Sequence, residues 1–247
     1  MSLFGLIGFP LSHSLSRSYF LEKFKVLCLK EADYQLFPLN SIEDLPDLLH
    51  QHPNLLGFNV TSPYKQAIIP YLHSLSPEAE KIGSVNVVKV KRVGNDLLLK
   101  GYNTDYIGFK DSLRELNLCS VRAALVLGTG GAAQAVNYAL QKLGLACSFV
   151  SRTPRNNRQL SYSQLSSQIL SSHQLIVNAT PVGMLGVDGE LPFPYKLLSS
   201  DHILYDLIYA PAETDFLQQG RLRGCTIKNG LEMLYLQADA SWRIWNE

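Results

Sequence analysis

The feature that most constrains the fold is the alternation of short apolar runs with longer amphipathic stretches. Strands are predicted at Leu3–Gly8, Tyr34–Phe37, Leu55–Val60, Val85–Val90, Leu97–Lys100, Ala123–Leu127, Ala146–Val150, Leu175–Asn178 and Ile203–Asp206. Helices are predicted between them at Ser18–Phe24, Ile42–His50, Tyr106–Leu116 and Ala133–Leu143. Alternation of this kind implies an α/β fold with parallel sheets and helices on both faces.

The strands fall into two sets, which predicts two lobes with a cleft between them. The 247 residues are enough for two small domains. We expect an N-terminal α/β domain over residues 1–105 and a second, Rossmann-like domain over residues 106–227. The stretch 228–247 has a helical pattern and little of its own to pack on, so we expect it to complete the first domain.

Composition narrows the class of protein. Hydrophobic residues make up 46% of the chain and the formal net charge is +1, so a polyanionic partner such as nucleic acid is not expected. The chain has no apolar run of about 18 residues and no basic leader before its first apolar segment, which favours a cytoplasmic protein with no membrane partner. The four cysteines show no metal-binding spacing, so we expect no metal and reduced, mostly buried thiols.

A glycine-rich turn follows the predicted strand Ala123–Leu127 and precedes a predicted helix. It contains the segment Gly128-Thr129-Gly130-Gly131-Ala132. Gly128 would allow the tight turn, and Gly130 would let the backbone approach a pyrophosphate. The small residues after them would bring the N–H groups of the helix N-terminus close to the phosphates. This context predicts a dinucleotide site.

The end of the next strand indicates which dinucleotide binds. An NAD-selective site usually places Asp or Glu there, whereas this chain has Ser151-Arg-Thr-Pro-Arg155. A guanidinium pairs well with a phosphate, so Arg152 and Arg155 favour the 2′-phosphate of NADP. The alternative is that these arginines merely line a solvated loop.

The first domain has polar clusters at the predicted ends of its strands, where open α/β sheets bind ligands. Ser14 and Ser16 follow the first strand, and on an extended loop both hydroxyls would point the same way and could bind a carboxylate. Further segments follow the later strands: Asn59-Val-Thr-Ser-Pro-Tyr-Lys65, Gly83-Ser-Val-Asn86 and Gly101-Tyr-Asn-Thr-Asp105.

Taken together, these segments resemble the shikimate dehydrogenase family. The resemblance covers nearly the whole chain, in the family's order, and rests on the following segments: Ser12-His-Ser-Leu-Ser16, Asn59–Lys65, Gly83–Asn86, Gly101–Asp105, Gly128–Ala133, Ser151-Arg-Thr153, Asn178-Ala-Thr-Pro-Val-Gly-Met184 and Asn229-Gly-Leu-Glu-Met-Leu-Tyr-Leu-Gln237.

The resemblance implies reversible reduction of 3-dehydroshikimate to shikimate by NADPH, in aromatic amino acid biosynthesis. Lys65 and Asp105 would flank the carbon that receives hydride. The resemblance implies that the substrate is bound by Ser14, Ser16, Thr61, Asn86, Tyr209 and Gln237. It implies that the cofactor is bound by Gly128, Thr129, Gly130, Gly131, Ala132, Ser151, Arg152, Thr153, Arg155, Thr180 and Gly230.

The residue types of the catalytic pair fit this chemistry. A carbonyl that receives hydride develops alkoxide character and needs a proton or a cation beside it, and a lysine supplies either. Asp105 would favour the charged form of Lys65 and burial the neutral form, so the sequence leaves open whether Lys65 is a proton donor or an electrostatic clamp. Taken alone, Lys65 would be a surface charge and Asp105 a helix N-cap.

Several positions depart from the family pattern. They leave the shape of the substrate loop and the strength of the adenosine contact open. The departures are Arg17 for Pro, Phe20-Leu21 for His/Met-Asn, Val87 for Thr, Ser151 for Asn and Glu232 for Gly.

The sequence also leaves two other functions open. A quinate/shikimate dehydrogenase and a non-catalytic dinucleotide sensor are the alternatives, and folate-interconverting dehydrogenases share only the two-lobe layout and a catalytic lysine. The sequence fits a monomer or a homodimer. We interpret His13 as structural, His50 and His52 as loop residues, and Trp242 and Trp245 as packing residues.

Overall fold

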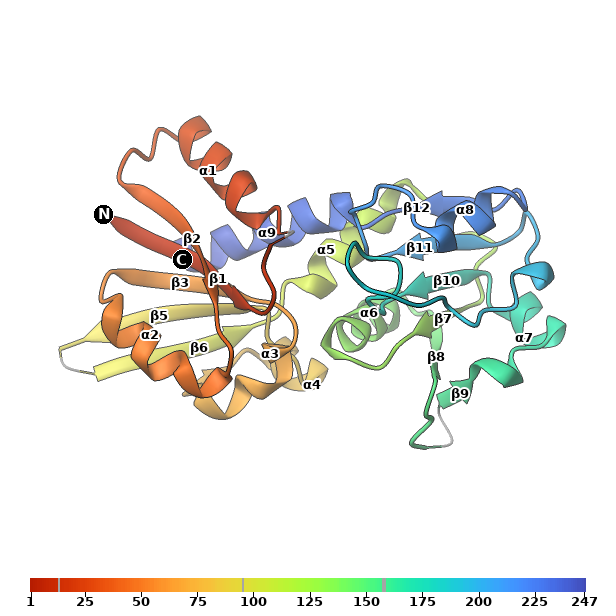
Figure 1. The fold of residues 1–247 in the computed structure, drawn as a ribbon, viewed down its shortest axis with the longest axis horizontal. Coiled ribbons are helices and arrows are strands. Elements are labelled where there is room, and N and C mark those ends of the chain that lie inside the picture. Colours follow the sequence, from red (N-terminus) through yellow and green to blue (C-terminus); the bar gives the residue numbers. More distant parts are fainter. Residues whose placement is uncertain (13, 95, 157–158) are drawn as a thin grey trace. The chain divides into compact units, whose positions relative to one another are not determined.

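The computed structural model describes residues 1–12, 14–94, 96–156 and 159–247, which form two compact units (Figure 1). The first unit comprises Met1–Gly108 and Tyr235–Glu247, and the second comprises Phe109–Leu234. His13 lies outside the described residues. None of the described helices is both long and apolar enough to cross a membrane.

The first unit is a six-stranded sheet covered by helices. Its elements are β1 (Ser2–Gly8), α1 (Ser16–Val26), β2 (Ala32–Pro38), η1 (Ile42–Asp44), α2 (Leu45–Gln51), β3 (Leu55–Val60), α3 (Tyr64–Ala67), η2 (Ile69–Tyr71), β4 (Ser74–Leu75), α4 (Pro77–Ile82), β5 (Val87–Val93) and β6 (Asp96–Tyr102). The strand order is β2-β1-β3-β5-β6-β4.

This first sheet is mixed, so the prediction that both sheets are parallel is wrong. Strand β5 is antiparallel to both of its neighbours, β3 and β6. Only two residues separate β5 from β6, and a connection this short can join only antiparallel strands. Gly94 begins that connection with a φ of +60°, a value that suits glycine in a hairpin turn.

The strand directions bring the polar segments to one edge of the sheet. Strands β1, β3 and β6 run the same way, so the residues that follow all three emerge at the same edge. Because β5 runs the opposite way, its first residue lies at that edge, and Asn86 immediately precedes it. The backbone confirms this placement, since the Val60 N–H donates to the Asn86 carbonyl at 2.9 Å.

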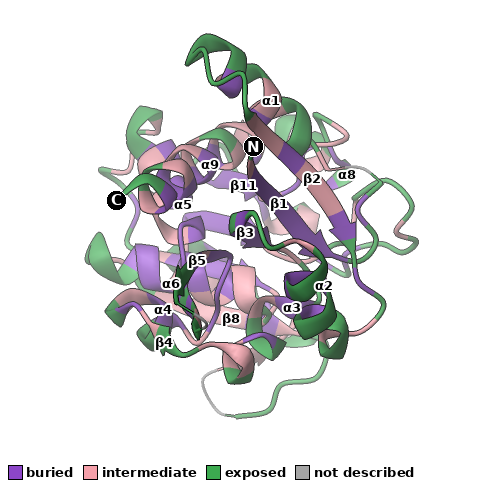
Figure 2. Ribbon diagram, turned by 90° about the vertical axis from the view of Figure 1, so that its left-hand side faces the viewer, coloured by how far each residue is buried: buried purple, intermediate pink, exposed green. Residues whose placement is uncertain are grey.

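Alternation along β1 divides the core of the first unit between the two faces of the sheet. Leu3 and Ile7 pack in a cluster with α2, α3 and α4, whereas Phe4 and Leu6 pack in a cluster with α1 and α9. Figure 2 shows β1 and β3 almost wholly buried between these layers. Trp245 stacks on Phe4 with ring centroids 4.9 Å apart, which confirms its predicted packing role.

The second unit is a fully parallel six-stranded sheet. The elements from α5 onward are α5 (Asp105–Ser112), η3 (Leu113–Glu115), β7 (Ala123–Leu127), α6 (Gly131–Lys142), β8 (Ala146–Ser151), β9 (Gln159–Ser161), η4 (Tyr162–Gln164), α7 (Ser167–Ser172), β10 (Leu175–Asn178), η5 (Tyr195–Leu197), β11 (Ile203–Asp206), α8 (Asp215–Arg221), β12 (Thr226–Lys228) and α9 (Leu231–Asn246). The chain passes between the units within α5 and again within α9.

The strand order of the second sheet confirms the predicted Rossmann-like topology. The order is β12-β11-β10-β7-β8-β9, and β7 pairs with both β8 and β10. The chain therefore winds outward from β7 in one direction and then from β10 in the other. Sheets of this kind bind ligands at the carboxyl ends of the two central strands, where the winding reverses.

The cysteines are unpaired thiols as predicted, but the prediction that most of them are buried is wrong. Cys28 lies exposed in the turn after α1, and Cys119 lies exposed before β7. Short connecting segments lie on the surface whatever their residue type, because their backbone groups need water. Cys225 is buried, and Cys147 is partly buried in β8, where burial raises its thiol pKa to about 12.

Candidate active site

Lys65 and Asp105 form a direct ion pair in the first unit. Lys65 lies in α3, just after β3, and Asp105 is the first residue of α5, just after β6. The Lys65 Nζ donates to the Asp105 Oδ2 at 2.6 Å, and the two side chains are only 16% and 7% exposed. The two residues are brought together across the sheet edge from 40 positions apart in sequence.

Two amide side chains complete the cluster around this pair. The Asn86 Nδ2 donates to the Asp105 Oδ1 at 2.8 Å and to the Gln237 Oε1 at 3.2 Å. The orientation of the Asn86 amide is fixed, because its Oδ1 accepts from the Thr104 N–H at 2.6 Å. Both carboxylate oxygens of Asp105 therefore accept hydrogen bonds from side chains.

The carboxylate of Asp105 does not serve as the N-cap of α5. The Tyr106 N–H at the start of this helix donates to the side-chain oxygen of Asn103 at 3.3 Å. Asn103 in turn donates from its Nδ2 to the Ser84 carbonyl at 2.9 Å. Asp105 is thus held by Lys65 and Asn86 and can act chemically with them.

The serine segment lies at the same edge but does not have the extended conformation expected from the sequence. Leu15 has φ −84° and ψ −3°, which are helical values, and Ser16 is the first residue of α1. The Ser14 Oγ accepts from the Ser16 N–H at 3.3 Å, so Ser14 satisfies a donor at the beginning of the helix. Thr61 joins this region, since its N–H donates to the Ile7 carbonyl at the end of β1 at 2.9 Å.

Four of the departures from the family pattern have structural explanations. Arg17 donates from its Nε to the Tyr34 carbonyl at 3.2 Å. Phe20 is fully buried and stacks on the Tyr34 ring, with centroids 4.4 Å apart. Val87 is also fully buried, and Glu232 forms an ion pair with Lys228. Arg17, Phe20 and Val87 therefore belong to the packing of the first unit, whereas Glu232 belongs to an ion pair of the second unit.

The glycine turn has the geometry of a phosphate cradle. Gly128 has a φ of +105°, which side chains rarely adopt, and a Cβ there would lie 3.2 Å from the Ala179 carbonyl oxygen at the end of β10. Gly130 precedes α6 as its N-cap and supplies no side chain to the helix N–H groups. A Cβ at Gly130 would meet nothing within 4 Å, so the space beside the turn is open.

These features fit a dinucleotide pyrophosphate. The helix that contains Gly131 and Ala132 begins with N–H groups that lack an intrahelical partner, and such groups bind phosphate oxygens. Thr129 lies between the two glycines, and its carbonyl accepts from the Gln134 side chain at 3.4 Å.

The arginine loop after β8 lies beside a pocket at the edge of the second sheet. Arg152 and Arg155 are both exposed, and the Thr153 N–H donates to the Ser151 Oγ at 3.2 Å. The pocket has a volume of about 680 Å³, and Arg155 and Ser161 are among its lining residues. This geometry fits an anionic group such as the 2′-phosphate of NADP.

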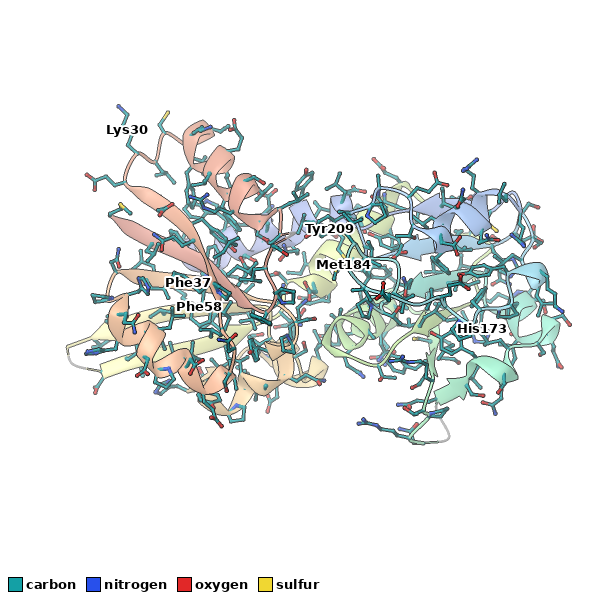
Figure 3. The ribbon with its side chains drawn as sticks, in the orientation of Figure 1. Lys30, Phe37, Phe58, His173, Met184 and Tyr209 are labelled. Carbon is teal, nitrogen blue, oxygen red and sulfur yellow. The ribbon has the colours of Figure 1, made fainter. Side chains whose placement is uncertain are left out.

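Two further loops emerge beside the cradle, after β10 and β11. The loop after β10 contains Thr180 and Met184, and the loop after β11 contains Tyr209 (Figure 3). The Thr180 hydroxyl donates to the Asn178 Oδ1 at 2.7 Å. The Asn178 Nδ2 in turn donates to the Asp206 Oδ1 at 3.1 Å, so the two loops are joined at their bases.

Asp206, which sequence reasoning missed, is the centre of this junction. It is fully buried at the end of β11 and accepts from the Ile208 N–H at 3.0 Å and the Thr214 hydroxyl at 2.6 Å. Burial raises the pKa of Asp206 to about 6, although hydrogen bonds from Thr214, Ile208 and Asn178 oppose the shift. Its place at a strand end in this lobe was the available sequence signal.

The raised pKa of Asp206 predicts a defined pH dependence of stability. Between about pH 4 and pH 6 the folded state holds a proton that the unfolded state has lost, so the contribution of Asp206 to stability falls as the pH rises. The fall is about 3 kcal/mol for a pKa near 6.

Urea unfolding of the parent protein and of the Asp206→Asn variant, at several pH values, measures this effect. Asparagine can still accept from Ile208 and Asn178, but it does not titrate. The difference in unfolding free energy between the two proteins should change by about 3 kcal/mol across this range. A difference that stays constant with pH would contradict the prediction.

Gly230 immediately precedes α9 and is held by close backbone packing. Its N–H donates to the Ile208 carbonyl at 3.0 Å, and a Cβ at this position would collide with the Leu207 carbonyl oxygen. The need for glycine here is therefore explained by packing within the second unit. Its predicted contact with the cofactor stays a prediction.

Comparison with proteins of known identity decides the family. The chain is 37% identical, over 99% of its length and 91% of the relative, to the shikimate dehydrogenase (NADP(+)) of Aquifex aeolicus. It is 34% identical, over 98% of its length and 91% of the relative, to the enzyme of that name from Caldanaerobacter subterraneus. The chain belongs to the shikimate dehydrogenase family.

The family model described as the shikimate dehydrogenase substrate binding domain matches residues 6–88 of the chain, all within the first unit. Solved structures of the shikimate dehydrogenase family agree over the whole chain. One is shikimate dehydrogenase 1 from Peptoclostridium difficile, with a TM-score of 0.84, 36% identity, and coverage of 100% of this chain and 92% of that one.

A second solved structure is shikimate 5-dehydrogenase from Thermus thermophilus in complex with NADP(H) and shikimate. Its TM-score is 0.85 at 33% identity, with coverage of 99% of this chain and 93% of that one. These comparisons confirm the predicted family and its α/β fold.

Proposed function

We propose that the chain catalyses the reversible NADPH-dependent reduction of 3-dehydroshikimate to shikimate, a step of aromatic amino acid biosynthesis. The observation that carries this proposal is the cluster of Lys65, Asp105, Asn86 and Gln237, in which an ion pair lies beside two amide groups. The identity of its relatives supports the same activity, because they are named shikimate dehydrogenase (NADP(+)).

The cluster supplies what a polyhydroxylated ring ketone needs. As an ammonium, Lys65 has three N–H donors and gives one to Asp105, which leaves others for the oxygen of the reacting carbonyl. Hydride addition makes that oxygen negative, and a proton or a fixed positive charge beside it stabilises the transition state. Asp105, Asn86 and Gln237 present acceptors and donors that match ring hydroxyls. We propose that Thr61 also binds a ring hydroxyl.

The carboxylate of the substrate would bind at the serine segment. Ser14 and Ser16 lie at the same sheet edge as the ion pair, and their hydroxyls can donate to a carboxylate without burying a countercharge. We propose that the hydroxyl of Tyr209 also binds the substrate carboxylate. In this scheme the first unit binds the substrate and the second unit binds the cofactor.

NADPH supplies the hydride when it is bound. The residues that fit it are those of the glycine turn, whose open space and uncapped helix would hold the pyrophosphate. Arg152 and Arg155 would hold the 2′-phosphate, with Ser151 and Thr153 shaping the loop between them. Thr180 would contact the nicotinamide half from the loop after β10.

Position 151 yields a prediction about cofactor affinity. Ser151 stands where the family pattern has Asn, and an asparagine is longer and adds amide donors that can reach the adenosine ribose. We expect Ser151→Asn to tighten NADP⁺ binding by about 2- to 12-fold, the effect of one added hydrogen bond. Fluorescence titration measures the dissociation constant. An unchanged or weaker affinity would count against a direct contact at this position.

Four parallel assays test the proposed activity. The purified protein is mixed with shikimate or quinate, each with NADP⁺ or NAD⁺, and absorbance at the reduced-nicotinamide band is recorded. We expect the highest kcat/KM for shikimate with NADP⁺. A higher value with quinate would identify a quinate dehydrogenase, and nucleotide binding without turnover of either acid would identify a sensor.

We also propose that the enzyme works in the cytoplasm. We propose that it is a monomer or a homodimer. Light scattering coupled to size-exclusion chromatography gives the mass of the particle in solution. A mass near 27.5 kDa would show a monomer and twice that mass a dimer.

A further inference from the structure

A continuous chain of buried hydrogen bonds runs behind the substrate side of the site in the first unit. Its members are Tyr34 on β2, Asn59 on β3, Ser241 on α9, and Thr104 beside Asp105. Tyr34, Ser241 and Thr104 are fully buried, and Asn59 is 5% exposed. These hydrogen bonds therefore join four segments that are far apart in the sequence, and all four side chains are buried.

One end of this chain of hydrogen bonds contacts the beginning of α1. The Tyr34 ring stacks on Phe20, and the Tyr34 carbonyl accepts from Arg17. The Tyr34 phenol donates to the Asn59 Oδ1 at 2.9 Å. Tyr34 therefore links the beginning of α1, whose first residue is Ser16, to Asn59.

The hydroxyl of Ser241 is the middle of this chain of hydrogen bonds. It accepts from the Asn59 Nδ2 at 3.0 Å and donates to the Gln237 carbonyl, one turn earlier in α9, at 2.8 Å. The Thr104 hydroxyl lies 3.1 Å from it. A single oxygen thus joins β3, α9 and the segment that leads into α5.

The other end of this chain of hydrogen bonds reaches the Lys65–Asp105 ion pair. The Thr104 hydroxyl accepts from the Asn86 Nδ2 at 3.0 Å, and the same amide nitrogen donates to Asp105. Thr104 also lies 3.4 Å from the Gln237 Oε1. Each buried polar atom named here has a partner, and networks of this kind fix one arrangement of the groups they join.

We propose that Tyr34 and Ser241 are positioning residues that hold Ser16 and Gln237 in register with Asn86 and Asp105. The inference rests on the proposed function, because it assigns these four groups to one substrate. A hydroxyl is needed at each point, since an apolar side chain of similar volume would fill the space but leave buried polar atoms of Asn59 and Thr104 short of a hydrogen-bond partner.

The test compares Tyr34→Phe, Ser241→Ala and their double variant with the parent enzyme. Steady-state oxidation of shikimate by NADP⁺ gives KM for each reactant. Loss of one hydrogen bond predicts a KM for shikimate about 2- to 12-fold higher in each single variant. The KM for NADP⁺ should stay unchanged. Because both hydroxyls act through Asn59, the double variant should be affected less than the product of the single effects.

KM for shikimate is the decisive readout. A variant that is merely less stable contains less active enzyme, which lowers the apparent kcat but leaves KM unchanged. The matched control is Ser84→Ala, because Ser84 is a fully buried serine of the same unit whose hydroxyl has no hydrogen-bond partner among the described residues. We expect this variant to keep the parent KM for shikimate.

Two results would overturn the inference, and they are distinguishable. If the parent enzyme oxidises shikimate and both single variants keep its KM, the positioning role is wrong while the proposed function stands. If the parent enzyme neither oxidises shikimate nor binds it in a calorimetric titration, the proposed function fails and the inference fails with it.

Discussion

Replacing Lys65 with alanine should lower kcat for shikimate oxidation by about 10²- to 10⁴-fold, the usual contribution of a positioned proton-transfer group. The Lys65 Nζ is the donor that pairs with the Asp105 Oδ2 at 2.6 Å, and its side chain is 16% exposed. An interaction made mainly in the transition state affects kcat more than KM, so KM for shikimate should change much less.

The matched control for this substitution is Lys30→Ala. Lys30 is exposed in the turn after α1, on the same unit (Figure 3). The control should retain the kcat of the parent enzyme. An unchanged kcat in the Lys65→Ala enzyme would show that Lys65 has no part in the reaction, and it would contradict the proposed catalytic pair.

Replacing Asp105 with asparagine should lower kcat/KM for shikimate by at least about 10²-fold. The two carboxylate oxygens of Asp105 accept from the Lys65 Nζ at 2.6 Å and from the Asn86 Nδ2 at 2.8 Å. An asparagine has only one acceptor oxygen, so its amide nitrogen must face one of these two donors. The substitution therefore displaces Lys65 or Asn86, and it also removes the negative charge beside the lysine.

A second asparagine variant separates this effect from a general loss of charge. Asp47 is exposed on α2 of the same unit, and Asp47→Asn should leave kcat/KM unchanged. Circular dichroism and thermal unfolding of both variants check that they fold. Retention of most of the parent activity by Asp105→Asn would show that the carboxylate has no part in the reaction.

Much of the fold could be predicted from apolar periodicity alone. The strands Leu55–Val60, Ala123–Leu127, Leu175–Asn178 and Ile203–Asp206 have the bounds predicted for them. These strands are buried, so nearly every residue in them is apolar and the pattern is unambiguous. In contrast, α7 (Ser167–Ser172) was not predicted, because only two of its six residues are apolar.

The direction of a strand is harder to predict than its existence. Periodicity is the same for parallel and antiparallel strands, so the reversal of β5 depended on the two-residue connection that follows it. That reversal determines the site, because it places Asn86 at the edge where Lys65 and Asp105 meet. The sequence motif identified these residues as a set before their geometry was known.

The supporting hydrogen bonds could not be predicted from one sequence. Tyr34 and Ser241 are residue types that are common on strands, helices and loops, and nothing in their sequence neighbours marks them as partners, whereas Asp206 had only its place at a strand end as a signal. Their contacts join positions 25 to 182 residues apart, and only the packed structure brings such positions together.

The division of the chain into units affects how it folds during synthesis. Residues 235–247 pack in the first unit, yet the ribosome makes them only after the 126 residues of the second unit. At the usual rate of about 5 to 20 residues per second, Trp242 is made about 11 to 44 seconds after Phe24, against which it packs. We therefore expect the second unit to fold before the first unit is complete, and the side chains of Phe4, Phe20 and Phe24 to stay exposed until the final helix has been made.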